Sequence, residues 1–177
     1  MGTQPPVVHL RAELRAAGYG DDEVRQLVRS GELTTVRRGA YLRGGLPDDR
    51  AVRHLAEIRA AAAQLSVDAV VSHVSAAVVR GWDVWGVALG RVRVTRARHN
   101  GGRIDPGLHV RTAPLREDEL EVVDEVLVTS GARIVVDVAR TVPFEQAVVV
   151  ADCALAKGDV DAEALAGRLL AGGWRLV

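Results

Sequence analysis

Arginine side chains that could contact nucleic acid lie in two neighbouring segments near the N-terminus. Arg25, Gln26 and Arg29 share one face of a predicted helix, and Arg37 and Arg38 follow in a predicted hairpin. Arginine can pair bidentately with guanine, and an arginine at a hairpin tip can enter a narrow minor groove. A solvated helix face and a solvated hairpin tip are the alternative interpretation. Because both elements carry the charge together, we predict that these five residues contact DNA.

The elements that position these side chains follow from the residue pattern. Apolar residues recur at helical spacing from Val24, and Gly31 ends the run. β-Favouring stretches at 33–37 and 40–43 flank Gly39, which can adopt a positive φ. A helix followed by an arginine-tipped hairpin has the outline of a winged helix-turn-helix domain, whose helix enters the major groove.

Three acidic residues begin this helix and weigh against its role as a base reader. Asp21 is the predicted N-cap, and Asp22 and Glu23 suit the positive end of the helix dipole. Uncompensated acids at this end would reduce the affinity for phosphates. We therefore expect Arg37 and Arg38 on the hairpin to be the main DNA contacts, with the helix residues secondary.

A second basic segment lies in the middle of the chain. Residues 91–116 contain seven Arg and one Asp, and two alternating stretches in it, 91–96 and 108–112, predict half-buried strands. The polar loop expected between them carries Arg98 and Arg103, and Arg96 precedes it. These three arginines form a candidate second anion site. A solvated arginine-rich hairpin face explains the pattern equally well, and both interpretations stay open.

Composition bounds the function further. The chain has 177 residues, 48% of them hydrophobic, which suffices for a sizeable core. One cysteine permits no intramolecular disulfide, and the five histidines are scattered without metal-ligand spacing, so we expect no metal and no cofactor. Neither a leader nor a long apolar run is present, and we expect a cytoplasmic protein without membrane contact.

The predicted fold class is α+β. We expect a winged helix-turn-helix domain at 1–46 that opens with a helix over 7–17, and a small mixed α/β domain at 47–177. In the second domain the periodicity predicts helices over 49–65, 72–79, 130–140, 143–156 and 161–170, and strands over 67–71, 91–96, 108–112, 120–123 and 126–129.

Ser72, His73 and Ser75 are of types that could form a nucleophile and its base. Neighbouring residues on a helix point in different directions, so we expect His73 to be structural and the protein not to be an enzyme. Arg133 and Asp137 are four residues apart on a predicted helix and should pair.

Several short motifs together resemble AbiEi-type antitoxins of type IV toxin–antitoxin systems over nearly the whole chain: GYxxxxV at 18–24, LVRxGEL at 27–33, VRRGxY at 36–41, SHxSAA at 72–77, TSxxRxxxD at 129–137 and ADxAL at 151–155. The resemblance implies a winged helix that binds operator DNA for autorepression. It also implies a C-terminal domain that opposes a nucleotidyltransferase toxin without a stable complex. A homodimer would suit paired half-sites, because one helix and one wing give limited specificity.

Two other functions stay open. Proteins with a similar front half continue into a Vsr-like or other PD-(D/E)XK endonuclease domain, whose catalytic residues would lie beyond Val177. On that hypothesis the chain is the truncated DNA-targeting portion of a nuclease. Alternatively the chain is an interaction module in which the acidic segment 117–177 and Trp82 or Trp85 bind a toxin.

Overall fold

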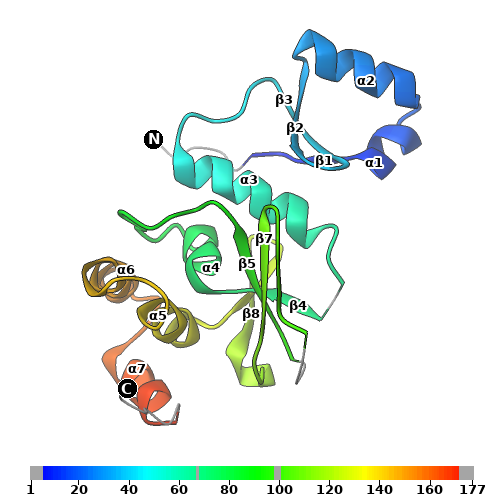
Figure 1. Ribbon diagram of the computed structural model, residues 1–177. Coiled ribbons are helices and arrows are strands. Elements are labelled where there is room, and N and C mark those ends of the chain that lie inside the picture. Colours follow the sequence, from blue (N-terminus) through cyan, green and yellow to red (C-terminus); the bar gives the residue numbers. More distant parts are fainter. Residues whose placement is uncertain (1–5, 67, 98–100, 172–177) are drawn as a thin grey trace. The chain divides into compact units, whose positions relative to one another are not determined.

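The computed structural model describes residues 6–66, 68–97 and 101–171, which fold as an α+β protein (Figure 1). The chain divides into two compact units, 1–65 and 66–177. The division therefore comes after Leu65 and not after residue 46. Its physical reason is that the helix over 50–62 packs on the hairpin that precedes it.

Unit 1 contains a three-stranded antiparallel sheet and three helices. Its elements in chain order are β1 (His9–Leu10), α1 (Arg11–Ala16), α2 (Asp21–Ser30), β2 (Leu33–Arg37), β3 (Ala40–Arg43) and α3 (Arg50–Ala62). The strand order is β1-β3-β2, so β3 is central. The helix over 21–30 and the hairpin that follows it are thus confirmed, while their assignment as a winged helix remains a prediction.

A hydrophobic cluster in unit 1 is formed by residues of α1, α2 and the two strands of the hairpin. Leu14 of α1, Val24 of α2, Leu33 of β2 and Tyr41 of β3 are all buried in one cluster. Burying such a side chain contributes about 1.5–3 kcal/mol relative to leaving it exposed. The cluster therefore fixes the exposed face of α2 relative to the hairpin.

The predicted helix over 7–17 is shorter than expected. His9 pairs with Tyr41 and Leu10 with Ala40, so these two residues extend the sheet and α1 begins only at Arg11. The helix that the spacing of apolar residues predicted is confirmed only over residues 11–16. Strand pairing with β3 outweighed it because β3 would otherwise be an edge strand with unpaired backbone groups.

Helix α3 begins at a strong cap and ends at the hairpin. The Asp49 carboxylate accepts hydrogen bonds from the backbone N–H groups of Ala51 (2.7 Å) and Val52 (3.0 Å). Beyond the last turn, Gln64 Nε2 donates a 2.9 Å hydrogen bond to the Arg38 carbonyl oxygen at the hairpin tip. The hairpin is therefore held by α3 as well as by its own strands.

Unit 2 is built on a mixed six-stranded sheet of order β6-β7-β5-β4-β9-β8. Its strands are β4 (Ala69–Val71), β5 (Val92–Arg96), β6 (Arg103–Asp105), β7 (Leu108–Thr112), β8 (Leu120–Val123) and β9 (Val126–Thr129). The pairs β5·β7 and β4·β9 are parallel, and the other pairs are antiparallel. Strand β6 lies in the segment predicted as a loop, where three residues were too few to show a period.

The helices of unit 2 are α4 (His73–Val79), α5 (Gly131–Ala139), α6 (Phe144–Ala156) and α7 (Ala162–Ala171), with the short 3-10 helix η1 at Glu117–Glu119. Helix α4 is buried throughout and contacts β5, β9 and α5. Trp82 is buried and donates to Asp159, so it is not available to a partner, whereas Trp85 is exposed. Among the described residues, no helix is long and apolar enough to cross a membrane.

The first turn of α5 approaches the loop before α7 closely, at Gly131. A Cβ there would lie 2.6 Å from Val160 Cγ2 and 3.0 Å from the Asp159 carbonyl oxygen. A Cβ added at Gly167 in α7 would meet nothing within 4 Å. Gly131 therefore serves as the test position for close packing, and Gly167 as its matched control.

We expect Gly131→Ala to lower the free energy of unfolding by about 1–3 kcal/mol, the usual cost of overpacking. Gly167→Ala should raise it by about 0.5–1 kcal/mol, because alanine is the better helix former. Urea unfolding followed by circular dichroism measures both. Equal stabilities of the two variants would contradict the close approach.

Candidate nucleic-acid surface and arginine-lined pocket

The five predicted DNA contacts of unit 1 lie on the two elements expected. Arg25, Gln26 and Arg29 are on α2, Arg38 is at the hairpin tip, and Arg37 is half-buried at the end of β2. A groove of about 410 Å³ bordered by Arg11, Arg25 and Arg29 runs beside α2. Arg25 and Arg29 of α2 therefore border this groove, while Arg37 and Arg38 lie at the hairpin turn.

The hairpin tip is anchored through its backbone. Its strands shift register between Thr35 and Arg37, and Arg37 pairs with Ala40. The Gly39 carbonyl accepts a 2.9 Å hydrogen bond from Arg11 N, and the Arg38 carbonyl is bonded by Gln64. Since the backbone is held on both sides, the exposed Arg38 and the half-buried Arg37 lie at a fixed turn.

The acids at the start of α2 are compensated, contrary to the expectation from sequence. Asp21 accepts hydrogen bonds from Arg15 (Nη2, 2.8 Å) and Arg11 (Nε, 3.2 Å), which lower its pKa to about 2. Asp22 pairs with Arg25 at 2.6 Å. The arginines of α1 could not be assigned to this role because the turn that brings them to α2 is set by tertiary packing.

The N-cap of α2 is also one residue earlier than predicted. Gly20 is the N-cap, and its N–H donates a 2.7 Å hydrogen bond to the Glu23 carboxylate. Asp21 is the first helical residue and turns its carboxylate to α1 instead of capping. The negative charges of Asp21 and Glu23 are thus used within unit 1.

Arg96 and Arg103, the two described arginines of the predicted second anion site, have different partners. Arg96 hydrogen-bonds to Ser66 Oγ at 2.9 Å and lies 3.8 Å from Asp68, while Arg103 pairs with Asp105 at 2.8 Å. Arg98 lies outside the residues whose secondary structure is described. Of Arg96 and Arg103, only Arg103 borders the pocket described next. Arg96 is instead held by Ser66 and Asp68 at the end of β5, so the second anion site over these arginines stays a prediction.

Unit 2 contains a pocket of about 790 Å³ lined mainly by polar side chains of β7, α4 and α5. Its cations are Arg103, Arg111, Arg133 and Arg140, and it also contains His73, Thr95, His109, Asp137 and Thr141. The basic character of strand residues such as Arg111 was evident from sequence. The contributions of Arg140 and Thr141 were not, because nothing in the sequence places the end of α5 beside β7.

His73 lies in this pocket in a conformation that brings it to Ser72. Its φ is 55°, in the left-handed region, and its Nδ1 is 2.9 Å from Ser72 Oγ, which also accepts a 2.8 Å hydrogen bond from Thr95. The expectation that adjacent residues point apart is therefore wrong here. It assumed helical geometry for both, whereas Ser72 is extended and His73 has a positive φ.

Burial, together with the nearby arginine charges, holds both histidines of the pocket in the neutral form. Burial lowers the pKa of His73 to about 3, and the charges of Arg111, Arg93 and Arg133 act in the same direction. Burial and Arg111 also lower the pKa of His109. At neutral pH each ring thus offers one N–H donor and one acceptor.

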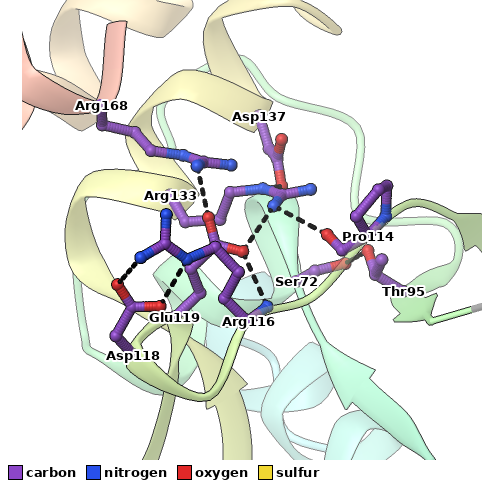
Figure 2. A network of polar contacts seen from close by, with 9 residues as sticks. All are labelled: Ser72, Thr95, Pro114, Arg116, Asp118, Glu119, Arg133, Asp137 and Arg168. Carbon is purple, nitrogen blue, oxygen red and sulfur yellow. Dashed lines mark hydrogen bonds and ion pairs between the residues drawn. The ribbon is translucent and has the colours of Figure 1, made fainter. Parts of the chain in front are cut away.

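Arg133 and Asp137 line the pocket from α5, and Figure 2 shows the network of polar contacts to which they belong. Arg133 Nε bonds to Asp137 Oδ2 at 2.8 Å, as the spacing of four predicted, and its Nη1 lies 3.1 Å from Glu119 Oε2. Nη1 also donates to the Pro114 carbonyl at 3.3 Å, and Glu119 pairs with Arg168. Burial raises the pKa of Asp137, against the opposing effect of Arg133.

Comparison with known proteins identifies a fold but no family. No family model matches the chain, and no curated protein matches it. The crystal structure of the Rv2827c protein from Mycobacterium tuberculosis is similar, with a TM-score of 0.58 and 19% sequence identity. The match covers 94% of this chain and 67% of that one. The two proteins therefore share a fold.

The low pKa of His73 makes a prediction for stability at acid pH. The unfolded chain binds a proton at His73 near pH 6.5, and the folded chain does so only near pH 3. The contribution of this group to stability is therefore fully present above about pH 6.5 and is lost as the pH falls toward 3.

We expect His73→Asn to reduce the slope of unfolding free energy against pH between 3 and 6.5. Asparagine tolerates the positive φ and does not titrate. Urea unfolding at a series of pH values measures the slope, and His9→Asn is the control at a histidine outside the pocket. An unchanged slope in His73→Asn would show that His73 is protonated normally in the folded protein.

Proposed function

We propose that this protein is a DNA-binding transcriptional regulator of the antitoxin type. In this proposal unit 1 acts as a winged helix-turn-helix domain, with α2 as the recognition helix and the β2–β3 hairpin as the wing. The observation that carries it is the fixed tip of a hairpin that bears Arg37 and Arg38 and packs against an arginine-bearing helix. Arginines on a rigid turn suit phosphate or minor-groove contacts.

The compensated acids support a larger part for α2 than the sequence suggested. Asp21 is paired with Arg11 and Arg15, so its charge opposes a phosphate less than a free carboxylate would. Arg29 remains accessible beside the groove, and no described acid pairs with it. Arg29 is thus the helix residue best placed to contact a base or phosphate.

The antitoxin part of the proposal rests on the AbiEi-type motifs in both units. On this proposal the protein represses its own operon and counters a nucleotidyltransferase toxin without chemistry of its own. Operator DNA is then the direct partner, and a homodimer would read two half-sites. A nucleotidyltransferase gene immediately downstream, and relief of its toxicity on coexpression with this chain, are the expected results.

The double variant Arg37→Ala with Arg38→Ala tests the wing. It should weaken binding to DNA from upstream of the gene by at least about tenfold, and lower the log-log salt slope by about 2, because each lost phosphate contact removes close to one unit. Fluorescence anisotropy at several salt concentrations measures both. Arg43→Ala, exposed at the other end of β3, is the matched control. Wild-type binding by the double variant would overturn the wing assignment.

Asp22→Asn tests whether α2 faces the DNA. The substitution removes a negative charge and releases Arg25 from its 2.6 Å ion pair, so binding should tighten by up to about fivefold, the range for an exposed pair. Asp118→Asn releases Arg116 in the same way in unit 2 and is the control. If the two variants bind DNA equally, α2 does not lie at the interface.

A further inference from the structure

The pocket of unit 2 concentrates positive charge in a protein whose formal net charge is zero. Four guanidinium groups line it, and Asp137 is the one carboxylate among the described lining residues. Asp105 and Glu119 are not among the described lining residues, and they pair with Arg103 and Arg133. Arg91 and Arg93 add to the positive potential around His109. The excess of cations favours an anion in this pocket.

Sheet register explains why the cations gather here. Strands β5 and β7 are parallel, with Arg93 beside His109 and Thr95 beside Arg111. Because side chains alternate along a strand, these four residues share one face of the sheet, while their neighbours on the other face, such as Val94 and Val110, are buried. The polar face is the one that His73 meets at the start of α4.

Of the four pocket arginines, Arg111 is the one for which the described residues supply no acidic partner. No described acid pairs with it, and its Nε is buried without a hydrogen-bond acceptor. Leaving a charged donor buried and unsatisfied costs stability, and such groups in native structures often mark a binding site. Arg133 differs, because Asp137, Glu119 and Pro114 already occupy its donors.

The neighbours of Arg111 have the donors that a phosphate needs. A guanidinium group can hold two phosphate oxygens with parallel hydrogen bonds, and neutral His73 and His109 each carry an N–H donor. The volume of about 790 Å³ lies within the usual range for small-molecule sites. It exceeds what an isolated phosphate requires and matches a ligand of nucleotide size.

We propose that this pocket binds the phosphate or pyrophosphate group of a nucleotide-sized ligand, with Arg111 as the principal anion contact. The site lies wholly within unit 2 and is independent of the proposed DNA contacts of unit 1. Nucleotides and the phosphorylated 5′ end of an RNA share this chemistry, and the experiment separates them.

Isothermal titration calorimetry of the full chain with pyrophosphate, ATP and a 5′-phosphorylated single-stranded RNA tests the proposal. We expect pyrophosphate and ATP to bind, and Arg111→Gln to weaken both by at least about tenfold, the usual loss for a hydrogen-bonded charged group. Arg111→Lys, which keeps the charge but loses the fork, should bind with intermediate affinity. Arg116→Gln, an exposed arginine of unit 2 outside the pocket, should bind like the wild type.

Two further measurements distinguish binding in the pocket of unit 2 from effects on folding and from DNA binding by unit 1. On adding pyrophosphate, the NMR signals of the His73 and His109 rings should shift, while that of His9 in unit 1 should not. The double variant Arg37→Ala with Arg38→Ala should bind pyrophosphate normally, whether or not it binds DNA. Absence of binding by both pyrophosphate and ATP, equal loss in Arg111→Gln and Arg116→Gln, or binding of the RNA alone would overturn the proposal.

Discussion

Unit 2 depends on the burial of one guanidinium group. Arg133 is only 6% exposed, and its donors bond to Asp137 on α5 itself, to Glu119 at the end of η1 and to the Pro114 carbonyl before η1. Removing this group would leave the buried Asp137 carboxylate without its ion-pair partner and would take one of the two arginine partners of Glu119, at a cost of about 3–5 kcal/mol. Because Glu119 also receives Arg168 from α7, helices α5 and α7 share one acid. Arg133 and Asp137 of this network also line the pocket beside Arg111 and His73. The network therefore helps to set the shape of the pocket around these two residues.

Unit 1 has a similar cluster of ion pairs at its surface, where each pair contributes less to stability. Asp21 of α2 pairs with Arg11 and Arg15 of α1, so an exposed cluster of ion pairs connects the first two helices. Exposed ion pairs contribute little stability, so the packing of Leu14 and Val24 carries most of the fold there. The cluster matters more for electrostatics, since it neutralises the acid nearest the groove beside α2. Burial thus decides whether a charge pair acts on stability or on surface potential.

Regular elements were predictable from sequence wherever side chains repeat with a clear period. The strands over 108–112, 120–123 and 126–129 and the helix over 144–156 match their predicted bounds almost residue for residue. Short pieces such as His9–Leu10 and Arg103–Asp105 were not, because their state depends on a partner strand far along the chain. The same holds for the sites: the arginines were visible, but whether Arg96 or Arg111 lines a pocket depends on the register of β5 and β7. The contact between Ser72 and His73 depends on a single positive φ.

The open sheet of unit 2 has two edge strands, β6 and β8, and each carries an apolar side chain in the open: Ile104 is 62% exposed and Val122 70%. Exposed edges invite strand addition from another chain, which leads to aggregation. Here Arg103 and Asp105 flank Ile104, and Glu121 precedes Val122. Both strands are also only three or four residues long. A protein with a formal net charge of zero at pH 7 lacks general charge repulsion, so these few gatekeeper charges are what opposes strand addition at the two edges.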